Sequence, residues 1–170
     1  MKSVVMVIAP AVFRDEEYVE PVAVLESRGA EVTTASTRPG ICTGKLGMEA
    51  MAEMDLAEAL RRDWDAVLFV GGGGSEVFFD DPSAHALAKR ALEAGAVLGA
   101  ICIAPSTLAR AGLLSGREAT AFPSQEEDLV AHGATWTGAP VTVDGRVITA
   151  NGPGAAMAFG EAVAEALALP

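Results

Sequence analysis

The chain has 170 residues, 51% of them hydrophobic, and a formal net charge of −11 at neutral pH. This length fits a single domain, residues 1–170, with a sizeable core. The negative charge opposes binding to phosphate backbones and aromatic residues are sparse, so nucleic acid is not an expected partner. The acidic balance instead favours solubility.

The sequence gives no sign of a membrane segment. It has no uninterrupted apolar run of about eighteen residues, and its N-terminal segment runs into acidic residues at Asp15–Glu17 rather than into small residues typical of a cleavage site. We therefore expect a cytoplasmic protein with no membrane partner. The two cysteines, Cys42 and Cys102, form no C-x-x-C motif, so we expect two reduced thiols and no metal site.

Apolar segments rich in Val and Ile alternate with segments of helical period, which is typical of a parallel sheet covered on both faces. The expected strands, in chain order, are Ser3–Ala9, Glu31–Ser36, Ala66–Val70, Val97–Ile101 and Val147–Thr149. The expected helices are Glu17–Arg28, Pro82–Ala94, Pro105–Ala111 and Ala155–Leu167. The first three helices are followed by glycines suited to left-handed C-terminal caps, Gly29, Gly95 and Gly112.

Three shorter features complete the pattern. A hairpin is expected around Gly44–Gly47. Ser124 and Glu127 fit a capping box that opens a further helix. Asp144-Gly145, between two β-like segments, predicts a two-residue hairpin turn of a primed type. Together these elements predict an α/β protein with a mostly parallel sheet.

Cys102 has the surroundings of a nucleophile elbow. It ends the apolar segment Ala96–Ile101, with Ala100 and Ala104 two positions to either side. Small residues there allow a sharp turn from strand to helix that lifts the nucleophile out of the sheet. A helix N-terminus and free amides favour thiolate over thiol, so we expect a lowered pKa for Cys102 but not for Cys42. The alternative is an inert cysteine that closes a core strand.

Three loops are expected at the carboxyl edge of the sheet, where open parallel sheets bind ligands. The first enters a helix through acidic residues, which usually only complement the helix dipole. Glu17 is the exception: four residues before Pro21, it is expected to face inward and to hydrogen-bond a thiolate when protonated. The second, Gly71–Ser75, matches neither the P-loop nor the dinucleotide fingerprint; its four glycines indicate amides near a ligand, with a flexible turn as the alternative. The third, Asn151–Gly154, fits a ligand loop or a helix cap.

The histidines limit the chemistry. A Cys-His pair needs an imidazole within hydrogen-bond reach of the thiol. Only His85 and His132 are present, both in helix-like segments far from the elbow, and the residue after Cys102 is Ile103. A peptidase or amidotransferase triad is therefore not expected.

Several motifs together resemble the ThiJ/PfpI superfamily: Glu17 ahead of Pro21, Gly72-Gly73, Cys102 within Ala100–Pro105, and Asn151–Gly154. The segments Thr43–Gly47 and Val141–Asn151 are similar to its PfpI-type bacterial and archaeal branch. The resemblance covers essentially the whole chain. It implies a flavodoxin-like three-layer sandwich of the class I glutamine-amidotransferase type, with a mostly parallel sheet, helices on both faces and a nucleophile elbow.

The resemblance also implies roles for residues. Cys102 is the elbow cysteine, Glu17 is the protonated carboxyl that hydrogen-bonds it, and the amides of Gly73 and Ile103 are candidates for an oxyanion hole. Further candidates for substrate contact are Gly72, Gly74, Phe122 and Pro153. Members described as peptidases carry His where this chain has Ile103, and others have His at the position of Phe122, so peptidase activity is not expected. The branch implies a homodimer or larger homo-oligomer and no cofactor.

The expected function is a cofactor-independent enzyme that acts on small reactive carbonyls, in the manner of a glyoxalase or deglycase. A thiolate can attack an aldehyde while Glu17 moves the proton. Two alternatives stay open. One is a hydrolase or hydratase of another small electrophile, selected by Ile103, Phe78 and Phe122. The other is a redox sensor or holdase in which Cys102 is oxidised to a sulfinic acid.

Overall fold

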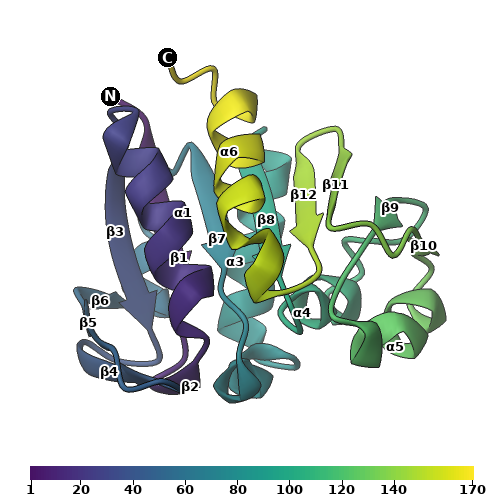
Figure 1. Ribbon diagram of the computed structural model, residues 1–170, viewed down its shortest axis with the longest axis horizontal. Helices are drawn as coiled ribbons and strands as arrows, with labels where there is room; N and C mark the ends of the chain where they lie inside the picture. The colour runs from purple at the N-terminus through teal and green to yellow at the C-terminus, as the bar shows by residue number, and fades with distance from the viewer.

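Seven strands form the central sheet in a computed structural model that describes residues 1–170 (Figure 1). They are β1 (Ser3–Val7), β3 (Glu31–Ser36), β6 (Met54–Asp55), β7 (Ala66–Phe69), β8 (Val97–Ile101), β11 (Val141–Asp144) and β12 (Val147–Ala150). Their order across the sheet is β11-β12-β8-β7-β1-β3-β6, and every neighbouring pair is parallel except β11 and β12. The expected mostly parallel sheet is confirmed.

Helices cover both faces of this sheet. On one face, α1 (Asp15–Ser27) and α6 (Ala156–Ala166) lie side by side, at the front in Figure 1. The opposite face carries α2 (Leu56–Ala59), α3 (Pro82–Glu93) and α4 (Pro105–Arg110), with α5 (Glu126–Ala131) packed on α4. Side chains alternate between the two layers along β1, because successive strand residues point to opposite faces. Val5 and Val7 join the core beneath α3, and Met6 joins the core beneath α1.

Two small sheets and three short helices lie outside this sandwich. The first small sheet contains β2 (Ala11–Phe13), β4 (Gly40–Gly44) and β5 (Glu49–Ala52), and the second contains β9 (Glu118–Ala119) and β10 (Thr135–Trp136). The 3₁₀ helices are η1 (Gly73–Phe78), η2 (Pro123–Gln125) and η3 (Pro153–Ala155). The antiparallel pairing of β4 with β5 confirms the hairpin expected at Gly44–Gly47.

Two local predictions need correction. The capping box is wrong: Ser124 lies in η2, its hydroxyl donates to the side-chain oxygen of Gln125, and α5 begins at Glu126 without a side-chain cap. The hairpin between β11 and β12 exists, but its turn is one residue later than expected, at Gly145-Arg146. Gly145 has φ 60°, and a glycine first in the turn supplies that conformation without strain.

The carboxyl ends of β1, β7, β8 and β12 lie at one edge of the sheet, the lower edge in Figure 1. Helices α1 and α6 also begin there. The segments that follow these strands, including Gly71–Gly74, Cys102 and Asn151–Gly154, therefore meet at this edge. None of the helices has the length and apolarity that a membrane span requires.

Candidate active site

Cys102 occupies a strained turn directly after β8. Its φ is 65°, which is rare for a residue with a side chain and costs energy that surrounding contacts must offset. The Cys102 amide donates to the Ala150 carbonyl (2.9 Å), and the Cys102 carbonyl accepts from the Phe122 amide (2.8 Å). The elbow is thus held from both sides, and the sulfur is presented at the start of the segment that leads into α4.

Glu17, in the first turn of α1, lies next to this elbow. Its side chain is 0% exposed, and neither carboxyl oxygen has a hydrogen-bond partner of normal geometry. Gly71 allows the close approach. A Cβ at Gly71 would lie 2.5 Å from Glu17 Oε1 and 2.6 Å from Cys102 Cβ, so any larger residue would separate the pair. The structure therefore places the Glu17 carboxyl beside the thiol, on the inward side of α1.

The two groups change one another's protonation. Burial raises the pKa of Glu17 to about 7, although the Cys102 thiol, Arg14 and the Gly71 amide act in the opposite direction. Burial, followed by the negative charge of Glu17, raises the pKa of Cys102 to about 12. The lowered pKa expected for Cys102 is wrong here, because the amides at the elbow do not offset burial and that charge. The pair carries at most one negative charge at neutral pH, so a thiolate requires the proton to stay on Glu17.

A cavity of about 230 Å³ opens beside the sulfur. It is lined by Arg14, Lys45, Gly72, Gly73, Cys102, Ile103, Phe122, Ser124 and Pro153. The lining includes most of the expected site residues. Glu17 is not part of the lining, because its carboxyl is fully buried beside the elbow.

The three glycines expected at the site differ in their surroundings. The amides that lower the pKa of Cys102 are those of Gly72 and Ile103, and both Gly72 and Gly73 line the cavity. Gly74 does not line the cavity. A Cβ there would lie 1.8 Å from the Ala11 carbonyl oxygen, so this glycine is needed for packing against β2.

The sequence did not single out Arg14, Lys45 or Ser124 as cavity residues. The Arg14 amide donates to the Gly71 carbonyl (2.9 Å), and its guanidinium donates from Nε to Glu16 (2.5 Å). Lys45 directly follows β4, in the turn between β4 and β5. It reaches the cavity because β4 also pairs with β2. The one available signal was the likeness of Thr43–Gly47 to the PfpI-type branch.

Neither histidine contributes to this cavity. His85, within α3, has Nε2 2.6 Å from the Phe79 carbonyl oxygen, and His132 is the C-cap of α5, with Nδ1 2.8 Å from the Asp128 carbonyl oxygen. No cluster of three or more His, Cys, Asp or Glu side chains is arranged to hold a metal ion. A second cavity of about 210 Å³ lies at the opposite edge of the sheet, beside Trp64 and α3, and contains no thiol.

Comparisons with known proteins agree with this geometry. The family model described as DJ-1/PfpI family matches residues 2–166. An uncharacterised protein of Methanocaldococcus jannaschii is 42% identical over 96% of this chain and 82% of its own, and a protein named deglycase from Pyrococcus abyssi is 31% identical over 88% and 90%. The crystal structure of a ThiJ/PfpI domain protein from Brachyspira murdochii superposes with a TM-score of 0.94, at 31% identity over 98% and 96% of the two chains. The chain belongs to the DJ-1/PfpI family.

Proposed function

We propose that this protein is a cofactor-independent enzyme that converts small reactive carbonyl compounds through a covalent adduct on Cys102. The observation that carries the proposal is the pairing of a thiol on a strained elbow with a buried carboxyl whose pKa is raised to about 7. A group of that pKa can both give and take a proton at neutral pH. The relatives named deglycase support an enzymatic role.

The first step is addition to an aldehyde such as methylglyoxal. With the proton on Glu17, the Cys102 thiolate attacks the aldehyde carbon, a C–S bond forms and the carbonyl electron pair moves to oxygen. The amides of Gly72 and Ile103, which act on the Cys102 sulfur, are candidates to stabilise that oxyanion. Glu17 then protonates the oxygen, which yields a hemithioacetal and leaves Glu17 as a carboxylate.

The second step moves a proton between carbons. The Glu17 carboxylate removes the proton from the carbon that carries sulfur, and the electron pair forms an enediolate whose negative charge lies on the oxygen of the neighbouring carbonyl. Glu17 returns the proton to that neighbouring carbon, while the hydroxyl proton on the sulfur-bearing carbon passes to the neighbouring oxygen. The product is a lactate thioester, and Glu17 is again a carboxylate. Water then adds to the acyl carbon, the C–S bond breaks and the thiol is restored. Methylglyoxal and water become lactate and a proton, with no oxidant or cofactor consumed.

Amide hydrolysis fits this site less well. An amine leaves only when its nitrogen is protonated, whereas addition to an aldehyde expels nothing. Cys-dependent peptidases use histidine for that proton, and neither His85 nor His132 lines the cavity.

The direct test measures lactate formed from methylglyoxal. Cys102→Ala should abolish turnover, while Cys42→Ala, which removes the other buried thiol away from the cavity, should retain it. Glu17→Gln should lower the rate by about 10²- to 10⁴-fold, the usual contribution of acid-base help. Full lactate formation by Cys102→Ala would refute the proposed nucleophile.

A further inference from the structure

We infer that the cavity selects carbonyl substrates that carry a carboxylate, and that Lys45 contacts this group. The inference rests on the proposed function, since it names the class of substrate for the same site. It follows from the charges around the cavity and from the way in which the Lys45 turn is built.

The charge at the cavity differs from that of the chain. Although the protein has a net charge of −11, the residues that line this cavity include two cations, Arg14 and Lys45, and no carboxylate. Arg14 is already paired with Glu16. Lys45 forms no ion pair with any residue. The positive charge of Lys45 therefore has no ionic partner on the protein and is free to pair with a carboxylate of the substrate.

The turn that carries Lys45 is held firmly. The Asp15 carboxylate is buried and accepts the amides of Leu46 and Met48, each at 3.0 Å, while the Lys45 amide donates to the Phe13 carbonyl (2.8 Å). Burial opposes ionisation of Asp15, but the two amides prevail and lower its pKa, so it is charged at neutral pH.

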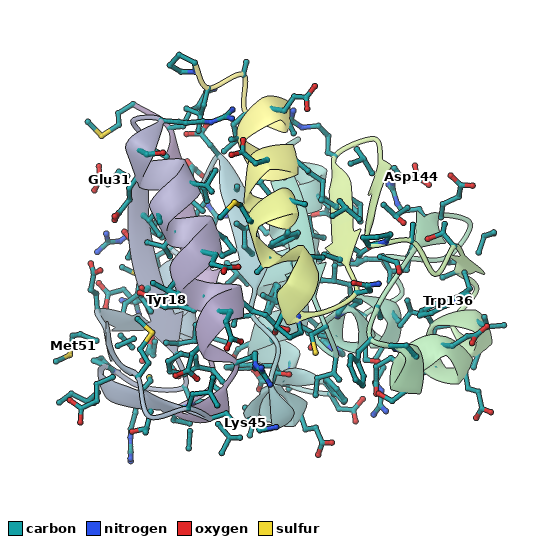
Figure 2. The ribbon with its side chains drawn as sticks, in the orientation of Figure 1. Tyr18, Glu31, Lys45, Met51, Trp136 and Asp144 are labelled. Atoms are coloured by element: carbon teal, nitrogen blue, oxygen red, sulfur yellow. The ribbon has the colours of Figure 1, made fainter.

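Gly44 permits this arrangement, because a Cβ there would lie 2.3 Å from Asp15 Oδ1. Figure 2 shows Lys45 at the lower edge of the molecule, below the ends at which α1 and α6 begin. The backbone of Lys45 is thus fixed to the helix turn that also supplies Glu17.

These positions orient a substrate. The Cys102–Glu17 pair holds up to one negative charge, which would repel a carboxylate placed at the sulfur. Lys45 would attract the same group to its part of the cavity wall. A compound with a carbonyl at one end and a carboxylate at the other satisfies both requirements, with its carbonyl carbon at Cys102.

A test that does not depend on turnover uses two alkylating probes of similar size. Iodoacetate is anionic and iodoacetamide is neutral. In both cases the Cys102 sulfur bonds to the methylene carbon, the C–I bond breaks and iodide leaves with its electron pair. The rate ratio of iodoacetate to iodoacetamide at Cys102, read by peptide mass spectrometry and divided by the same ratio for N-acetylcysteine, measures the preference for an anion. Changes in the thiolate fraction cancel in this ratio.

We expect a normalised ratio above one in the wild type. Lys45→Gln should lower it about two- to fivefold, the range of a solvent-exposed ion pair, and Lys45→Arg should preserve it. Lys89→Gln removes an equal charge from the exposed side of α3 and should leave the ratio unchanged. Salt near 1 M should reduce the wild-type ratio, since the Debye length shortens to about 3 Å. An equal ratio in Lys45→Gln and wild type would overturn the inference.

A second arm uses substrates. The compound 4,5-dioxopentanoate joins the oxoaldehyde of methylglyoxal to a carboxylate, and its methyl ester is the neutral match. The wild type should show a higher kcat/KM for the acid, and Lys45→Gln should lose that advantage while Lys89→Gln keeps it. Absence of turnover for all three carbonyls with an intact alkylation preference would refute the proposed function alone. Turnover without preference for the acid would refute the carboxylate inference alone.

Discussion

The buried carboxyl of Glu17 should make folding stability depend on pH. Its pKa rises from an ordinary value of 4.5 to about 7 in the folded protein, mainly through burial. A raised pKa means that the folded state holds its proton more tightly than the unfolded chain does. The stabilisation is therefore complete below pH 4.5 and is lost as the pH rises through 7. The difference of about 2.5 pKa units corresponds to about 3 kcal/mol at pH 8.

Glu17→Gln removes this titration. We expect the free energy of unfolding of the variant, relative to wild type, to increase by about 3 kcal/mol between pH 4.5 and pH 8. Urea unfolding at several pH values, followed by circular dichroism, measures both proteins. The change with pH is the informative quantity, because the Gln amide adds a constant cost of its own. Glu20→Gln, on the same helix but outside the cavity, removes an equal charge as a control. A difference between Glu17→Gln and wild type that stays constant from pH 4.5 to 8 would refute the reasoning.

Three further predictions concern the same site. The rate of Cys102 alkylation by iodoacetamide, plotted against pH, should show a midpoint near pH 7 in wild type, where the Cys102–Glu17 pair loses its first proton. Glu17→Gln should lack this midpoint, and an unchanged profile in the variant would contradict the coupling between Glu17 and Cys102. Gly71→Ala should separate Glu17 from Cys102, lower lactate formation at least tenfold and cost about 1–3 kcal/mol of stability. Gly154 has open space around it, so Gly154→Ala should change neither activity nor stability. Equal behaviour of the two variants would refute this prediction. The purified protein should leave casein uncut over hours, and cleavage that disappears in Cys102→Ala would show that amide chemistry is present.

Much of the fold could be predicted because its signals are local. Strand β8 stands out as a short continuous apolar segment, and Gly95 marks the end of α3, where it has a positive φ. The elements that were missed are short: β6 and β9 have two residues each, β2 has three and α2 has four, too few to show a period. They form because the completed sheet or a neighbouring loop offers them a partner.

The site was predictable in part for the same reason. The alanines that flank Cys102 in the sequence were enough to predict the elbow. Lys45, in contrast, lies at the cavity only because β4 pairs with β2. The direction of the Cys102 pKa also depends on tertiary packing. The helix and the amides that favour a thiolate can be predicted from the local sequence. The burial that opposes a thiolate cannot, because it comes from residues that are distant in the sequence.

The first turn of α1 shows how three consecutive carboxylates come to differ in protonation and in role. Asp15, Glu16 and Glu17 are consecutive carboxylates that would each complement the helix dipole. Two amides hold Asp15 ionised, whereas at Glu17 burial outweighs the Gly71 amide and raises the pKa to about 7. Glu16 pairs with Arg14 instead. One turn of helix thus supplies two different groups: the charged Asp15, which anchors the Lys45 turn, and Glu17, which can give or take a proton beside Cys102. The difference comes from the neighbours of each carboxylate and not from the residue type.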